Sequence, residues 1–241
     1  MIAALDPTIL ALGLVVLVGS MVQSMIGFGV AVVAAPVVVV VRPDLMPASL
    51  LICVFVLPLT QLLTGPRDIA RQALGWALGA RLLATPLGVL VVAATTPDVI
   101  ALAVGVLILV TVVASVTAVD LRPSAPNAAA AGTVTGVSAT AASIGGPFLA
   151  LVLQHEPPQR IRATLAAFFL AGSVIGVTGL AVAGQVDAPD VVAGLAWIPF
   201  VLVGHLVARP MLSRIPATAV RRGVLAFCVF ASVGVIARVV V

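Results

Sequence analysis

Long apolar segments, separated by short charged or proline-rich stretches, are the feature that most limits how this chain can fold. Eight of them run through the 241 residues, at 8–41, 45–64, 73–94, 99–119, 128–154, 161–183, 191–212 and 219–241. A helix needs about 20 apolar residues to cross the ~30 Å hydrocarbon core of a bilayer. Ten-residue segments of alternating polarity, typical of transmembrane barrels, are missing from the sequence. The pattern predicts an all-α integral membrane protein.

The composition supports the same fold class. Hydrophobic residues make up 62% of the chain, mean hydropathy is +1.32 and charged residues are only 8%. A soluble domain carries about 25% charged residues, so this chain cannot cover a globule of its size with polar surface. All twelve basic residues are Arg, and no stretch interleaves basic and aromatic residues, so a nucleic-acid partner is not expected.

The sequence also lacks recognisable enzyme machinery. It contains no Ser-His-Asp arrangement, no Gly-rich nucleotide loop and no paired carboxylates within an apolar segment. Cys53 and Cys228 lie deep in apolar segments without a CxxC or Cys/His cluster, so neither a metal site nor a cofactor is predicted. The N-terminal residues have no basic region and include Asp6, which is unlike a cleaved signal peptide.

Two segments are too long for one crossing. At 1.5 Å per residue, 8–41 would span about 51 Å and 128–154 about 40 Å. The first is interrupted by Gly27-Phe28-Gly29 and the second by Ser143-Ile144-Gly145-Gly146-Pro147, with Gly145 116 positions after Gly29. The same offset pairs Gly88 with Gly204. Each broken segment leads a set of four, which predicts a tandem duplication with halves at 1–122 and 123–241.

The arginine distribution distinguishes two topologies. If every segment crosses once, seven arginines lie on one side of the membrane and four on the other. If 8–41 and 128–154 are hairpins that return to their own side, nine lie on one side and only Arg42 and Arg238 on the other. The positive-inside rule favours the hairpin topology. We therefore expect both termini outside the cell and the two halves inverted relative to each other.

Broken hydrophobic segments at corresponding positions of inverted halves indicate the central site of a transporter. Glycine lets the backbone turn at such a break, and helix N-termini there favour an anion. We expect the substrate-binding residues at these two breaks, with the scattered glycines, such as Gly172 and Gly176, serving only close helix packing. The candidate ligands are Gln23, Ser24, Gly27, Phe28 and Gly29 in the first half, and Thr140, Ser143, Ile144, Gly145, Gly146 and Pro147 in the second.

Arg81 is the one basic residue well inside an apolar segment, and charge at that depth suggests a functional site. Two interpretations stay open, namely attraction of an anion to a cytoplasmic vestibule and snorkelling of the side chain to the interface. His205 is expected to be a packing histidine with its ring nitrogens satisfied.

The residues from Gly19 to Pro36 and from Gly132 to Pro147 resemble the glycine-rich breaks of the TauE/SafE family of sulfite and organosulfonate exporters. Val30 and Ser143 depart from the family pattern, since each stands where a glycine is usual. The resemblance implies a multi-pass permease of the cytoplasmic membrane that exports a small sulfur oxyanion or sulfonate, here expected to work by alternating access. A proton- or sodium-coupled importer of a related anion and a non-transporting membrane scaffold are the alternatives, and the oligomeric state is left open.

Overall fold

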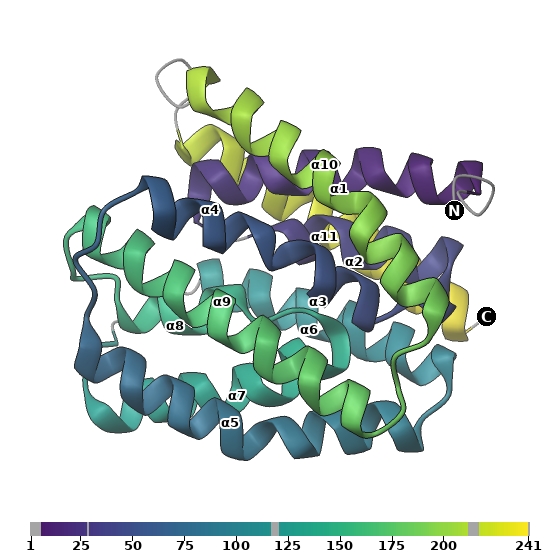
Figure 1. Ribbon diagram of the computed structural model, residues 1–241, viewed down its shortest axis with the longest axis horizontal. Coiled ribbons are helices and arrows are strands. Elements are labelled where there is room, and N and C mark those ends of the chain that lie inside the picture. Colours follow the sequence, from purple (N-terminus) through teal and green to yellow (C-terminus); the bar gives the residue numbers. More distant parts are fainter. Residues whose placement is uncertain (1–5, 28, 117–120, 212–216, 241) are drawn as a thin grey trace.

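The computed structural model describes residues 6–27, 29–116, 121–211 and 217–240, and within these ranges it consists of helices without strands. The elements are α1 (Pro7–Ile26), α2 (Val30–Val41), the 3-10 turn η2 (Pro43–Leu45), α3 (Ala48–Val54), α4 (Val56–Thr64), α5 (Arg71–Ala94), α6 (Pro97–Val116), α7 (Ala125–Ala142), α8 (Gly146–Val152), α9 (Pro158–Val182), α10 (Ala188–Met211) and α11 (Ala217–Val240). Figure 1 shows a bundle of helices, with α4, α9 and α10 toward the viewer.

The predicted all-α membrane class is confirmed. Among the described residues, five helices are long and apolar enough to cross a membrane. These are Pro7–Ile26, Arg71–Ala94, Pro158–Val182, Ala188–Ala208 and Arg222–Val239. The observed helices begin and end within a few residues of the predicted segments, and the last residues of the predicted segment 99–119 lie outside the described ranges.

One predicted helix is divided in two. The segment 45–64 forms η2, α3 and α4, with an interruption at Phe55. Pro58 lies in the first turn of α4 and has no N–H, so it cannot donate a helical hydrogen bond to the carbonyl of Val54. Phe55 itself keeps helical backbone angles (φ −56°, ψ −39°), so α3 and α4 continue one apolar stretch, Ala48–Thr64, with a break in its helical hydrogen bonding.

The first overlong segment folds back on itself. Asp6 caps α1 by accepting a hydrogen bond from the Thr8 N–H (2.9 Å). Arg42, just after α2, pairs with Asp6 (3.3 Å) and Asp44 (2.7 Å), which places the end of α2 beside the start of α1. The Arg42 guanidinium also lowers the pKa of Asp44, through the hydrogen bond between them. Arg238 of α11 donates to the Val40 carbonyl at this end of the bundle, where Figure 1 shows the start of α1 and the end of α11.

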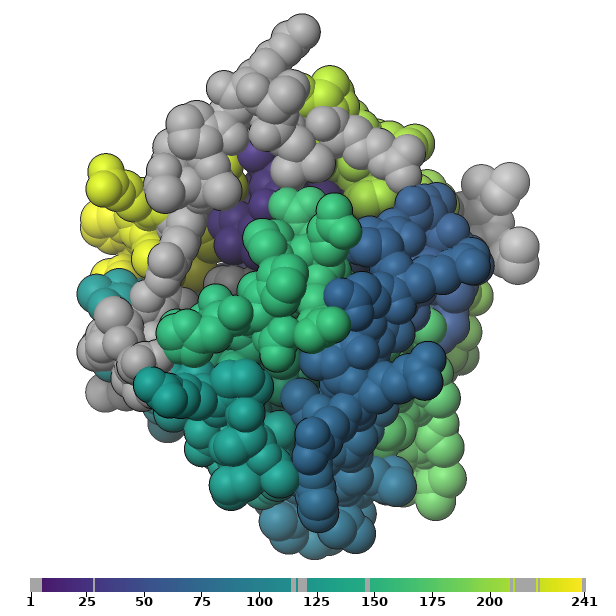
Figure 2. Space-filling view, turned by 90° about the vertical axis from the view of Figure 1, so that its left-hand side faces the viewer, coloured from purple at the N-terminus to yellow at the C-terminus, as the bar shows by residue number. Residues whose placement is uncertain are grey.

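The second overlong segment also forms a hairpin. Gln154, beyond α8, donates to the Leu121 carbonyl ahead of α7 (3.4 Å), so this segment too leaves where it enters. Arg160 bonds Asp68 (3.1 Å) and Glu156 (3.1 Å) at the same end. Figure 2 looks onto this end, where the segment between α4 and α5 (blue) lies beside the segment leading into α9 (green). In Figure 1 the open ends of the two hairpins lie at opposite ends of the bundle.

Each hairpin packs against a helix from the other half of the chain. Helix α1 lies along α10, and α7 lies along α5. The contacts depend on glycine, because a Cβ on Gly132 of α7 would collide with the Ala77 backbone of α5. On α5, a Cβ on Gly88 would lie 2.8 Å from the Val137 carbonyl oxygen of α7. These helices therefore approach at backbone distance.

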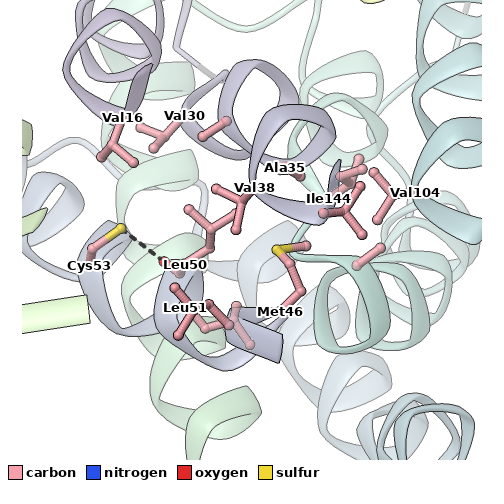
Figure 3. Close-up of a cluster of buried hydrophobic side chains, with 14 of the residues drawn as sticks. Val16, Val30, Ala35, Val38, Met46, Leu50, Leu51, Cys53, Val104 and Ile144 are labelled. Carbon is pink, nitrogen blue, oxygen red and sulfur yellow. Dashed lines mark hydrogen bonds between the residues drawn. The ribbon is translucent and has the colours of Figure 1, made fainter. Parts of the chain in front are cut away.

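The hydrophobic core fills the space around the first hairpin. Figure 3 shows Val16, Val30, Val38 and Leu50 packed together, with Ile144 of the second break contacting the same cluster from the other hairpin. All five side chains are fully buried. The core thus fixes the positions of both hairpin tips.

The α5–α7 contact leads to a stability prediction. Gly132→Ala should lower the melting temperature of the purified protein, because the new methyl would push the two backbones apart at a cost of about 1–3 kcal/mol. Gly79→Ala on α5 is the matched control, since a Cβ there meets nothing within 4 Å. Thermal unfolding in detergent compares the two variants, and equal melting temperatures for both would contradict the packing described.

Candidate functional site

The tips of the two hairpins meet at a cavity of about 50 Å³ lined mostly by buried residues, here called the central cavity. A single water needs roughly 10–15 Å³ of such space, so the cavity can hold an ion of a few heavy atoms. Its lining comes from both hairpins and from α3, α5 and α9. The lining residues are Gln23, Gly29, Ala31, Val32, Leu51, Val54, Arg81, Ala139, Ser143, Gly145, Phe169 and Ser173.

The first hairpin tip turns on glycine and is closed by a side chain. Gly27 (φ 100°) and Gly29 (φ 144°) adopt backbone conformations that side chains disfavour. Gln23 Oε1 accepts a hydrogen bond from the Val30 N–H at 3.1 Å, at the first residue of α2. The remaining first-turn residues Ala31 and Val32 line the cavity, so the positive end of the α2 dipole faces it.

The second tip uses serine where the first uses glycine. Ser143 has φ 60°, a left-handed conformation, and its hydroxyl donates to the Pro47 carbonyl at 3.0 Å. Thr135 Oγ1 donates to the Gly145 carbonyl at 3.3 Å. These two bonds pair two carbonyl groups of the break inside the protein, at the turn where Ser143 takes its left-handed conformation.

Arg81 lies inside the bundle, 3% exposed, and does not reach the protein surface. Its guanidinium carbon is 5.0 Å from the centre of the Phe168 ring, and its Nε has no hydrogen-bond partner. No Asp or Glu is among the described residues that line the cavity. A buried guanidinium without a carboxylate partner favours an anion beside it. The snorkelled position considered from the sequence is not the one observed.

Helix α9 makes room for this guanidinium. A Cβ on Gly172 would collide with the Arg81 guanidinium, and the neighbouring Ser173 lines the cavity. We expected Gly172 to serve only helix packing, and the structure adds that its missing side chain leaves space for the Arg81 guanidinium. The sequence signal was weak, since Gly172-Ser173 has the same small-residue character as a helix seam. At Gly176 a Cβ would make an ordinary 3.4 Å contact with Leu51, so glycine is not required there.

The candidate residues divide into several groups. The central cavity brings together Gln23, Gly29, Ser143, Gly145 and Arg81. Ser24 and Gly27 line a second cavity, described below, with His205. Thr140 and Ile144 are fully buried and are not among the lining residues of the central cavity. Gly146 and Pro147 lie in the first turn of α8, and Phe28 lies outside the described residues.

No metal centre is found in the described part of the chain, where no three His, Cys, Asp or Glu side chains gather. The chemistry available at the central cavity is therefore that of a guanidinium, serine hydroxyls and a helix N-terminus. These groups attract and orient an anion.

Comparison with known proteins gives one family. The sequence model described as sulfite exporter TauE/SafE matches residues 11–235, nearly the whole chain. Searches of curated proteins and of solved structures found no significant match.

The burial of the Arg81 guanidinium leads to a prediction about the stability of the protein when this group is removed. Arg81→Met should raise the melting temperature of the protein measured without added small anions, because a buried charge without an acidic partner costs free energy that an apolar side chain of similar length does not. Arg162→Met, at an exposed arginine, should change the melting temperature little. A clear loss of stability in Arg81→Met would show that the guanidinium has a structural partner instead.

Proposed function

The chain belongs to the sulfite exporter TauE/SafE family, and on that premise we propose that it exports a small sulfur oxyanion or sulfonate through the central cavity. Members of the family are transporters and not enzymes. Family and apolar helices together make this a multi-pass membrane protein with a small anionic substrate. The cytoplasmic membrane is the bilayer in which an exporter of this kind acts.

The observation that most supports the anion site is the burial of Arg81 beside a cavity with no Asp or Glu among its described lining residues. An isolated charge within a membrane protein is costly and is kept where it binds a substrate or an ion. The first turn of α2 and the Ser143 and Ser173 hydroxyls complete a set of donors around the same space. The anion would exchange part of its hydration shell for these groups.

The helix pairing supports the duplicated, inverted layout that the repeats suggested. We propose that 1–122 and 123–241 are equivalent halves, with α1 against α10 matching α7 against α5. The pair Gly88 and Gly204 fits this scheme, because a Cβ on either glycine would collide with the hairpin helix of the other half. With the arginine-rich end in the cytoplasm, both termini lie outside the cell.

The membrane potential is sufficient to drive export. An anion that leaves an inside-negative cell gains about 2.3 kcal/mol per charge per 100 mV. Since about 1.4 kcal/mol is tenfold, that gain sustains roughly a fiftyfold gradient per charge. We propose uniport by alternating access, in which one group of helices moves against the other around the central cavity.

Efflux from proteoliposomes tests this function. Purified protein is reconstituted with sulfite or methanesulfonate inside, and efflux is followed with an outward-driving potential. Wild-type efflux should depend on the potential, and Arg81→Met should lose most of it. Efflux that is unchanged at zero potential would overturn uniport, and uptake driven by a proton or sodium gradient would identify the coupled importer. A folded wild-type sample without flux for either anion would overturn the substrate assignment.

The contact between Arg81 and Gly172 of α9 allows a variant that tests the position of the guanidinium without removing its charge. Gly172→Ala should reduce efflux about tenfold or more, because the methyl displaces the guanidinium from the site of the anion while leaving its charge in place. Gly176→Ala is the matched control one turn along the same helix, where the new methyl makes an ordinary contact. Efflux is measured at equal protein incorporation. Equal losses in both variants would attribute the effect to packing of α9 and not to Arg81.

A further inference from the structure

A second cavity, here called the vestibule, adjoins the central cavity toward the arginine-rich end. Its volume is about 160 Å³. It lies between the first hairpin tip, the end of α4 and the start of α9. The lining residues are Gln23, Ser24, Gly27, Gln61, Thr64, Gly65, Pro66, Arg162, Ala163 and His205.

The vestibule carries the groups that an anion requires. Arg162 is exposed at its rim and takes part in none of the ion pairs described, whereas Arg160 is occupied by Asp68 and Glu156. Hydroxyl and amide side chains complete the lining, and Ser24 Oγ lies 2.8 Å from His205 Nδ1. No Asp or Glu is among its described lining residues. An anion can therefore be held there while it keeps much of its water.

Gln23 stands between the two cavities. Among the described residues it is the one that lines both. The side chain is 7% exposed, and its Oε1 accepts the Val30 N–H. Because the oxygen is engaged, the Nε2 group is the part of the amide that remains to face a ligand. An NH₂ group donates two hydrogen bonds and accepts none, which suits an anion and not a cation.

We propose that the vestibule is a second anion site, occupied before the central cavity, and that Gln23 is the gate through which the anion passes between them. This inference rests on the proposed function. The anion first meets Arg162 at the water-accessible rim, then exchanges water for the Gln23 Nε2–H donors, and then reaches Arg81. Dividing the desolvation between two sites keeps each one weak enough for the anion to leave, as conduction and transport require.

The first test removes the NH₂ donors of Gln23 and keeps the hydrogen bond that closes the first hairpin tip. Gln23→Glu preserves an oxygen that accepts the Val30 N–H, but it replaces the NH₂ donors with negative charge. Efflux of methanesulfonate, measured at equal incorporation of folded protein, should fall about tenfold or more. Gln72→Glu, exposed on α5 at the same end of the bundle and outside both cavities, is the control for added charge. Normal efflux in Gln23→Glu would overturn the proposed contact between Gln23 and the anion.

The second test measures how fast a thiol reagent reaches each cavity, which does not depend on transport activity. In a background where Cys53 and Cys228 are replaced by Ala, Thr64→Cys places a thiol in the vestibule and Ser173→Cys places one in the central cavity. A membrane-impermeant sulfonatoethyl methanethiosulfonate reagent, added from the arginine-rich side, should modify position 64 quickly and position 173 slowly. Adding Gln23→Ala should speed modification at 173 by about tenfold or more, since the gate is removed.

The outcomes separate this inference from the proposed function. Equal reactivity at positions 64 and 173 with Gln23 intact would overturn the gate, even in a protein that transports normally. A wild type that exports neither sulfite nor methanesulfonate would overturn the proposed function, while the thiol reactivities would still show whether Gln23 closes the central cavity.

Discussion

Backbone polar groups cannot be left unpaired in a hydrocarbon environment, and the whole architecture depends on how the two helix breaks meet that requirement. Side chains pair the backbone groups at these breaks. At the first break, Gln23 Oε1 accepts a hydrogen bond from the Val30 N–H. At the second, the Thr135 and Ser143 hydroxyls donate to the carbonyls of Gly145 and Pro47. Each bond holds a non-helical stretch inside the protein, away from lipid. Because both stretches are enclosed in this way, a small polar space exists between them, while the long helices around it expose many apolar side chains.

The elements that follow from length and spacing could be predicted from the sequence. An overlong apolar segment must be broken or must tilt strongly, and glycine marks where each break occurs, so the two hairpins and most helix bounds agree with expectation. The family resemblance read from the two breaks is confirmed over residues 11–235. The convergence of Gln23, Gly29, Ser143 and Arg81 on one cavity agrees with the expected position of a central site, while their contact with a substrate stays a prediction.

What could not be predicted depends on side-chain direction across helices. Ile144 and Thr140 lie beside cavity-lining residues in sequence, yet they are fully buried and outside the cavity lining, because consecutive positions on a helix or turn face different ways. The contact between Gly172 and the Arg81 guanidinium could not be predicted either. A glycine that packs against a helix and a glycine that accommodates a guanidinium have the same sequence signature, and only the path of the Arg81 side chain distinguishes them.

The charge of Arg81, which has no acidic partner among the described residues that line the central cavity, has an electrical consequence in the proposed transport cycle. In a carrier of the kind proposed, a bound monoanion makes the occupied site neutral, whereas the empty site carries one positive charge. The transmembrane voltage then acts on the empty carrier and hardly at all on the loaded one. In the proposed cycle, an inside-negative potential would pull the empty site toward the cytoplasm, so the cell's own voltage would return the protein to the side from which it exports its substrate.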